Sequence, residues 1–200
     1  GTSTFGRTQA FASNFMPLLR DNSEFAAKWS NLSTAQLEEG IHDAVKVYEY
    51  MNKYYVVEGN KRVSVLKFFG ATTILADVTR KVPKRSDDPE NRIYYEYMDF
   101  YALTQINYIR FSKIGSYAKL LTATDKNTED EWTNEERLDF SSFYAEFSKA
   151  FIERGGLYLK NVTIGDALLI YLTIYPYKEA KESSLSDIRT NIDKNLNKKY

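Results

Sequence analysis

The sequence predicts an α+β protein in two parts: a small mixed sheet with helices over residues 1–86, then an all-helical region over residues 87–200. Residues 45–57 are rich in β-forming side chains and begin with an apolar/polar alternation, which favours strands. From residue 88 onward, capping residues precede apolar residues at helical spacing. Residues 1–86 hold 12 basic and 8 acidic residues, whereas residues 87–200 hold 15 basic and 19 acidic residues. The net charge therefore changes from positive to negative between the two parts, and we place the boundary within residues 83–89.

The first elements of the chain are predicted to be two helices. Ser23 can cap a helix that continues to about residue 31. Ser33 and Gln36 have the spacing of a capping box, which predicts a second, short helix. Gly40 supplies the stop for that helix.

A hairpin, a helix and a closing strand follow. Residues 45–50 and 54–57 read as two strands joined by a turn at residues 51–53. Asn60 can cap a helix that ends at Gly70. Residues 73–78 then read as a strand.

The second part shows three clear helix starts. Asp88 and Pro89 begin a helix that continues to about residue 101, because proline suits the first helical position. A capping box opens the second helix and a Thr/Asp pair opens the third, and these helices end at a Gly-Gly pair and a proline. These signals are Thr133 with Glu136 before Gly155-Gly156, and Thr163 with Asp166 before Pro176. The many aromatic residues lie at helical spacing, which favours a core over a stacking surface for single-stranded nucleic acid.

Composition excludes several function classes. The chain has no cysteine and a single histidine, His42, so thiol catalysis, Cys-based zinc sites and His-rich metal sites are excluded. Acidic and basic residues balance at 27 each, which is not the pattern of a basic nucleic-acid coat. The longest apolar run spans residues 167–170, far below the roughly 20 residues that cross a bilayer. We therefore expect no transmembrane segment and a cytoplasmic protein, and the start without methionine predicts that the natural chain extends upstream.

The segment from Glu58 to Arg62 is the candidate binding site. Gly59 stands where a strand gives way to a helix, so a ligand can approach the backbone closely. The N–H groups of a first helical turn favour an anion. Lys61 and Arg62 lie in that turn, where the helix dipole disfavours cations unless an anion compensates. The pattern predicts phosphate or carboxylate binding, with a solvated surface pair as the alternative.

These residues resemble the ParB/sulfiredoxin-type domain over roughly residues 5–82. The resemblance rests on the short helix ending in glycine, the hairpin, the G-x-x-R turn that opens a helix, and the closing strand. It implies that Gly59 and Arg62 contact ligand phosphates and that Arg7 faces the same site. Asn60 and Lys61 stand where the family usually has Glu-Arg, and the sulfiredoxin reaction is excluded because it needs a cysteine. No basic recognition helix follows, which disfavours operator reading.

The whole chain also resembles the amino-terminal region of uncharacterised Gram-positive proteins. In those proteins a ParB-like domain precedes a substrate-binding domain of the basic-membrane-protein type. Residues 11–18 and 58–69 carry this resemblance. It implies that the chain is part of a longer protein with such a domain.

Three functions are weighed from these observations. The first is a regulatory module that binds a nucleotide or nucleic acid at Gly59, Asn60, Lys61 and Arg62, with Arg7 closing the site. The second is a nuclease or nucleotide hydrolase in which Glu58, joined by Asp77, acts with a divalent metal such as magnesium. The third is a structural module with a decayed site, in which internal salt bridges occupy Arg62. A basic cluster at Arg80, Lys81, Lys84 and Arg85 either contacts a phosphate backbone or is a solvated linker.

Overall fold

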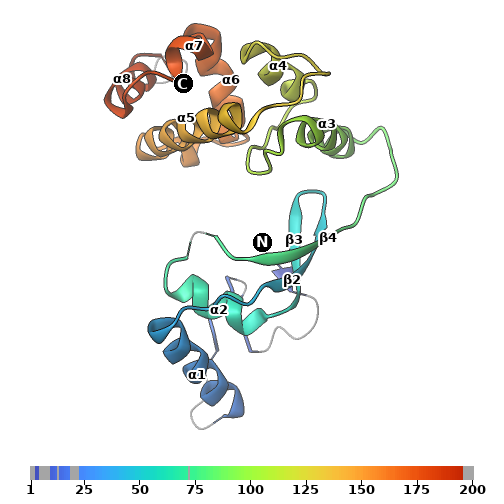
Figure 1. Ribbon diagram of the computed structural model, residues 1–200, viewed down its shortest axis with the longest axis vertical. Coiled ribbons are helices and arrows are strands. Elements are labelled where there is room, and N and C mark those ends of the chain that lie inside the picture. The colour runs from blue at the N-terminus through green and yellow to red at the C-terminus, as the bar shows by residue number, and fades with distance from the viewer. Residues whose placement is uncertain (1–2, 5–9, 13, 19–22, 72, 196–200) are drawn as a thin grey trace. The chain divides into compact units, whose positions relative to one another are not determined.

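The structure is a computed structural model that describes residues 3–4, 10–12, 14–18, 23–71 and 73–195. Contacts within the chain divide it into two compact units, residues 1–84 and 85–200, which we call the sheet unit and the helical unit (Figure 1). This division falls two residues before the boundary placed from the sequence.

The sheet unit contains a small mixed sheet with two helices, so the α+β fold class is confirmed. The strand order is β1-β3-β2-β4; β2 and β3 are antiparallel, whereas β1 runs parallel to β3 and β4 parallel to β2. The parallel pairing of β2 with β4 requires a crossover, and α2 lies in that connection. The elements are β1 (Ser3–Thr4), α1 (Glu24–Glu38), β2 (Val45–Tyr50), β3 (Lys53–Glu58), α2 (Asn60–Phe68) and β4 (Ala76–Arg80).

The predicted hairpin is confirmed, and the closing strand is shifted. Met51 and Asn52 connect β2 to β3 with φ angles of 52° and 61°, which suits the twist of a two-residue hairpin turn. The closing strand spans Ala76–Arg80 rather than residues 73–78. Its register is set by tertiary pairing with β2, from Val45 opposite Ala76 to Glu49 opposite Arg80, and this pairing overrides the local β propensity of residues 73–75.

The prediction of two helices before Gly40 is wrong, because α1 is continuous. The Ser23 hydroxyl accepts a hydrogen bond from the Ala26 N–H, as predicted for the N-cap. Ser33 lies inside the helix, and the Gln36 side chain accepts a hydrogen bond from the Ile41 N–H beyond its end. The same two residues that resemble a capping box therefore belong to the last turns of one helix.

A buried tryptophan joins the two helices of the sheet unit. The Trp29 indole N–H donates to the Ser64 hydroxyl on α2 at 3.0 Å. Its ring also makes an edge-to-face contact with Phe68, with 5.4 Å between the ring centroids. This contact fixes α1 against α2, which places the start of α2 beside α1.

All regular elements among the described residues of the helical unit, 85–195, are helices, and loops join them. The N-caps predicted at Asp88, Thr133 and Thr163 are confirmed, the latter two as complete capping boxes. Three further helices were not predicted individually, at residues 116–123, 177–180 and 185–195. The first of them has Gly115 at its N-cap, which offers no capping side chain. The helices are α3 (Pro89–Thr104), α4 (Ser116–Ala123), α5 (Asn134–Glu153), α6 (Ile164–Ile174), α7 (Tyr177–Ala180) and α8 (Leu185–Asn195), with a 3₁₀ turn at Gly156–Tyr158.

Aromatic side chains form the core of the helical unit, as their helical spacing predicts. Phe147 is fully buried, and its ring centroid lies 6.0 Å from that of Phe151 and 5.2 Å from that of Tyr171. Phe140 and Tyr117 are equally enclosed. Such ring pairs each add about 0.5–1.5 kcal/mol beyond the burial of their area.

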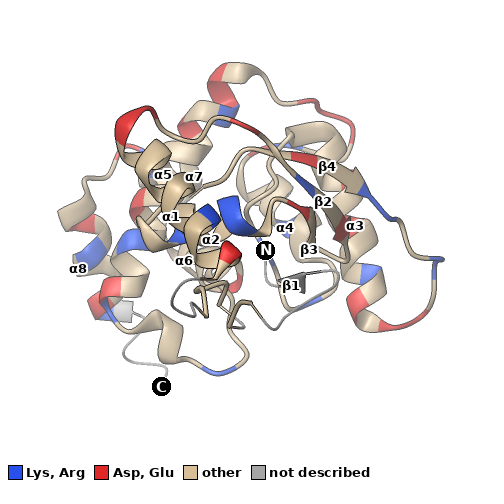
Figure 2. Ribbon diagram, turned by 90° about the horizontal axis from the view of Figure 1, so that it is seen from below, with Lys and Arg blue, Asp and Glu red and all other residues tan. Residues whose placement is uncertain are grey.

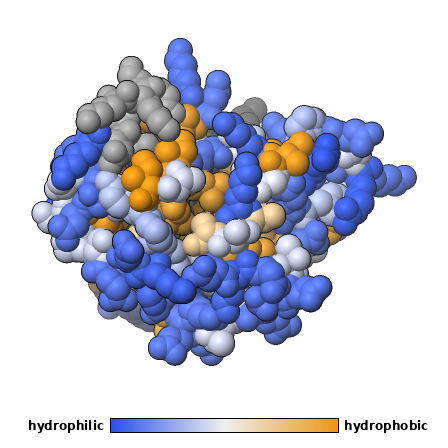
Figure 3. Space-filling view, turned by 90° about the horizontal axis from the view of Figure 1, so that it is seen from above, coloured by the Kyte–Doolittle hydropathy of each residue, from blue (hydrophilic) through white to orange (hydrophobic). Residues whose placement is uncertain are grey.

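On the face drawn in Figure 3, hydrophilic side chains surround smaller apolar patches. Within the described part of the chain, no helix combines the length and the apolar character needed to cross a membrane.

Candidate functional site

A cavity of about 760 Å³ lies in the sheet unit at the N-terminal end of α2. It brings together the predicted residues Gly59, Asn60, Lys61 and Arg62, and α1 supplies one of its walls. Ala10, Phe11, Phe25, Lys28, Leu32 and Asp43 complete the lining. Glu58, the predicted catalytic residue, is not among the residues that line it.

Gly59 is required at the turn into α2. It is the N-cap of α2 with φ 99° and ψ 20°, a left-handed conformation that side chains with a Cβ rarely adopt. A Cβ on Gly59 would lie 2.6 Å from Cγ1 of Val45, a buried residue of β2. Asn60 is therefore the first helical residue and not the cap, which corrects the sequence prediction. Because Gly59 has no side chain, the backbone between β3 and α2 can lie close to the Val45 side chain of β2.

The first turn of α2 has no side-chain cap. Within the described part of the chain, no side chain accepts a hydrogen bond at this N-cap, so the N–H groups at this helix end lack the capping partner that Ser23 gives α1. The side-chain oxygen of Asn60 is buried and accepts no hydrogen bond from the described residues. An uncapped helix start facing a cavity is suited to an anionic or hydrogen-bonding ligand.

Arg62 is anchored by the backbone. Its Nη1 donates to the Ala44 carbonyl oxygen at 2.8 Å, and its side chain is 20% exposed. Among the described residues, the only carboxylate within ion-pair distance of Arg62 is Glu58, whose Oε1 lies 4.0 Å from Nη2. Because an arginine carries five N–H donors, this arrangement orients the guanidinium and leaves donors for a ligand.

The charges along the cavity are mainly positive. Lys28, Lys61 and Arg62 line it together with one acidic residue, Asp43. The Lys61 ammonium lies 5.6 Å from the centroid of the Phe25 ring on α1, and Lys28 pairs with Glu24. The ribbon in Figure 2 marks the basic residues of α2 in blue.

Glu58 is arranged as an ion-pair partner. Its Oε2 lies 2.8 Å from the Lys46 ammonium. This hydrogen bond and the charge of Lys46 hold the pKa of Glu58 below its ordinary value, and the nearby charge of Arg62 acts in the same direction. A general base at neutral pH works best with a raised pKa, so this environment does not favour Glu58 in that role.

Asp77 does not join Glu58. Both strands that carry these carboxylates flank β2, and Lys46 is the register partner of Glu58 on one side and of Asp77 on the other. The lysine therefore separates the two carboxylates across the sheet. Among the described residues, no group of three or more His, Cys, Asp or Glu side chains could hold a metal ion.

Three residues of the basic cluster, which begins at the last residue of β4, make contacts within the chain. Arg80 donates through Nε to the buried carboxylate of Glu49 at 2.7 Å. The Lys81 ammonium lies 4.6 Å from the centroid of the Tyr48 ring, and the Arg85 guanidinium lies 4.1 Å from that of Tyr95. Arg80, Lys81 and Arg85 therefore interact with other side chains of the fold.

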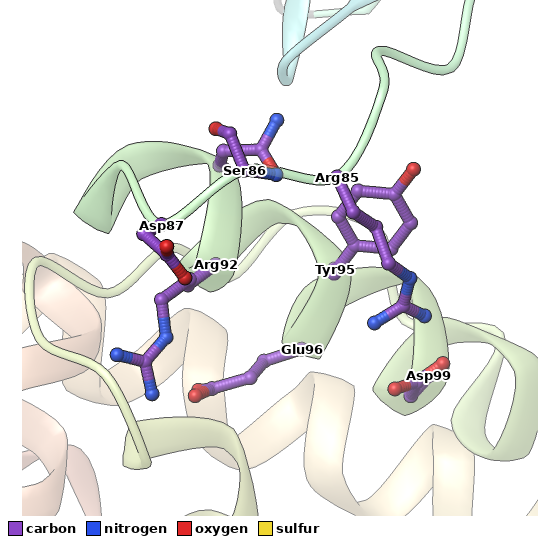
Figure 4. Close-up of a pocket in the computed structure, with 8 residues that line it drawn as sticks. Arg85, Ser86, Asp87, Arg92, Tyr95, Glu96 and Asp99 are labelled. Atoms are coloured by element: carbon purple, nitrogen blue, oxygen red, sulfur yellow. The ribbon is translucent and has the colours of Figure 1, made fainter.

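A second pocket, of about 450 Å³, surrounds the start of α3. Figure 4 shows Arg85 beside the Tyr95 ring, with its guanidinium extending toward Asp99. Arg92 and Glu96 also line this pocket. Both basic and acidic side chains line this pocket. Its lining is therefore not predominantly positive, unlike that of the cavity at the start of α2.

The predicted site residues and the residues that line the cavity differ at several positions. Arg7 lies outside the described residues. Phe25, Lys28 and Leu32 were missed, although their spacing of three and seven residues places them on one face of α1. This periodicity in the sequence indicates that the three residues share a helix face. It does not indicate that the face lies beside the start of α2, which only the structure shows.

Comparison with known protein families and curated sequences identifies no relative of the chain. No protein-family model matches the chain, and no curated protein sequence matches it significantly.

Proposed function

We propose that the sheet unit is a ParB-like regulatory module that binds a phosphate-bearing ligand, a nucleotide or nucleic acid, at the start of α2. The observation that carries the proposal is the uncapped first turn of α2, which opens into a cavity lined by Lys28, Lys61 and Arg62. Arg7 is proposed to close the same site.

The electrostatics of the turn support an anion. The helix dipole disfavours each cation near the N-terminus by about 0.3–1 kcal/mol, so Lys61 and Arg62 stand in a slightly unfavourable place. A bound phosphate would accept hydrogen bonds from the first-turn N–H groups. Its negative charge would also offset the repulsion between the positive end of the helix dipole and the two basic side chains. The guanidinium, held by Ala44, can add a charge-assisted hydrogen bond.

The size of the cavity favours more than a single phosphate. Small-molecule sites in proteins measure about 300–1,000 Å³, and the cavity of about 760 Å³ lies in that range. Phe11 and Phe25 make an edge-to-face pair on its lining, with 5.1 Å between ring centroids. An aromatic pair beside an anion site suits a ligand that joins a phosphate to a ring.

The other two functions have less support. The hydrolase hypothesis needs Glu58 as a base or metal ligand, and Glu58 pairs with Lys46. The decayed-site hypothesis needs Arg62 in internal salt bridges, and its nearest described carboxylate oxygen is 4.0 Å away. We also propose a cytoplasmic location, and the resemblance of the whole chain supports a module within a longer protein that carries a substrate-binding domain.

Replacing Arg62 with alanine is expected to weaken ligand binding about ten- to a hundredfold, because a charge-assisted hydrogen bond contributes about 1.5–3 kcal/mol. The ligand is first selected by a thermal-shift screen of nucleoside triphosphates and single-stranded DNA, with and without magnesium. Calorimetry then compares the affinity of the variant with that of the unmodified chain.

Lys67→Ala is the matched control, because Lys67 lies in the last turn of the same helix. It should bind as tightly as the unmodified chain. Glu58→Gln should bind equally or more tightly, because it removes a negative charge near the anion. Equal affinity of the Arg62→Ala and Lys67→Ala variants would contradict the proposal, and metal-dependent cleavage that Glu58→Gln abolishes would favour the hydrolase instead.

A further inference from the structure

The strand β4 forms one edge of the sheet, because the strand order ends with it and β2 is its partner strand in the described chain. The pairing continues beyond both ends of the strand. The Val45 N–H donates to the Leu75 carbonyl oxygen at 3.0 Å, and the Lys81 N–H donates to the Glu49 carbonyl oxygen at 2.7 Å. In a parallel ladder, alternate residues direct their backbone groups to the same neighbour. Residues 75, 77, 79 and 81 therefore face β2, whereas the backbone groups of residues 76, 78 and 80 point away from the sheet.

This edge lacks two of the features that usually keep sheet edges from pairing with other chains. The register of β4 on β2 runs without a bulge, and no proline occurs between residues 76 and 82. Val78 and Val82 are 49% and 53% exposed. The edge therefore offers outward-pointing backbone groups and exposed apolar side chains to another strand.

The side chains along β4 carry charges in a pattern that is complementary to itself. Asp77, Thr79 and Lys81 project on the same face of the sheet, because side chains alternate between the faces of a strand. All three are exposed. Asp77 and Lys81 stand two residues before and two residues after Thr79. If two copies of this strand pair antiparallel about Thr79, Asp77 of each copy lies opposite Lys81 of the other.

Backbone geometry and charge favour this register over the alternatives. In a new antiparallel ladder, residues that point outward must lie opposite each other, so two identical strands can be centred on a residue but not between two residues. Centring the pair on Asp77 or Arg80 would place like charges directly opposite each other. Centring on Ala76 or Val78 avoids this repulsion but forms no ion pair. Among the registers centred on β4, the one about Thr79 alone places two pairs of opposite charges across the interface.

We propose that β4 is a self-association surface, through which two copies of this chain join their sheets edge to edge about a two-fold axis at Thr79. The hydrogen-bonded pairs of the new ladder are Val78 with Arg80 of the second copy, and Ala76 with Val82 of the second copy. The two-fold arrangement uses both β4 edges, so association through this surface stops at a dimer. Because each copy contributes one short strand, the dimer forms at micromolar rather than nanomolar concentrations.

Hydrogen exchange of the backbone amides, measured on the full 200-residue chain at increasing concentration, tests the proposed ladder. The amides of Val78 and Arg80 should exchange more slowly as the concentration rises to about 1 mM, the range of weak protein affinities. The amides of Asp77 and Thr79 should be protected at every concentration, because they face β2. Sedimentation velocity on the same samples should show the mass of a dimer.

Charge reversal tests the register. Asp77→Lys and Lys81→Asp should each weaken self-association about tenfold, because attractive cross-strand pairs become repulsive. An equal mixture of the two variants should associate as strongly as the unmodified chain, since each carries the charge that the other lacks. The double variant Asp77→Lys/Lys81→Asp should also recover the dimer. Glu38→Lys, the same charge reversal at an exposed position of α1, is the control and should not change the association.

Four results would overturn the proposal. The first is a chain that stays monomeric up to about 1 mM. The second is equal protection of the Val78 and Arg80 amides at every concentration, which would show that the chain itself covers this edge. The third is a dimer that Asp77→Lys leaves intact. The fourth is a mixture of Asp77→Lys and Lys81→Asp that associates no better than either variant alone. If a variant does not fold, the exchange rates of the unmodified chain decide the matter.

Discussion

Replacing Arg80 with leucine is expected to lower the free energy of unfolding of the sheet unit by about 3–5 kcal/mol. The carboxylate of Glu49 is 1% exposed, and it accepts hydrogen bonds from Arg80 Nε and from the Asn52 N–H, both at 2.7 Å. Without the guanidinium, a buried negative charge loses a cation that stabilises it. The pair also fixes the register of β4 on β2, since the two residues are partners across those strands.

Urea unfolding, followed through the indole signal of Trp29, reports on the sheet unit separately from the helical unit. The double variant Glu49→Leu/Arg80→Leu should recover most of the loss, because a buried ion pair can be replaced by apolar side chains at little cost. Lys53→Leu, at an exposed position of β3, is the control for adding a leucine to the hairpin. A loss below 1 kcal/mol in Arg80→Leu would show that the pair is not important for stability.

Replacing Gly59 with alanine is expected to cost about 2–4 kcal/mol of folding free energy. A φ of 99° is unfavourable for any residue with a Cβ, and the added carbon would overlap Cγ1 of Val45. The overlap can be relieved only by shifting β2 against the start of α2. The same variant should also weaken phosphate binding, because the first turn of α2 would move.

Gly70→Ala is the matched control for this substitution. Gly70 also has a positive φ, 76°, but a Cβ there would meet nothing within 4 Å. It should lose only the conformational part, about 1–2 kcal/mol. The two losses are compared by the same urea titration, and equal losses would contradict the close approach of Gly59 to Val45.

Features that depend on neighbouring residues were predictable from the sequence. The caps at Ser23, Asp88, Thr133 and Thr163 are local hydrogen bonds between residues three apart, so the residue types suffice to locate them. The hairpin was predictable for the same reason, because its two strands are joined directly. Ser33 and Gln36 show the limit of this reasoning, since the same pattern also occurs inside a continuous helix.

Features that depend on distant contacts were not predictable. The start of β4 is set by its pairing with β2, and α4 has no capping side chain to announce it. At the site, the turn from Gly59 to Arg62 was found from local chemistry, but the wall supplied by α1 was not. The separation of Glu58 from Asp77 by Lys46 follows from the strand order, which the sequence alone does not give.

The central claim, a phosphate site at the start of α2, is tested most directly by a backbone amide titration of the full-length chain. Inorganic pyrophosphate, or the nucleotide selected by the thermal-shift screen, is added to the nitrogen-labelled protein. The account predicts that the largest, saturable shifts occur at the amides of Asn60, Lys61 and Arg62, because those N–H groups lack a side-chain cap. Shifts confined to residues 85–195, or the absence of any saturable shift, would contradict it.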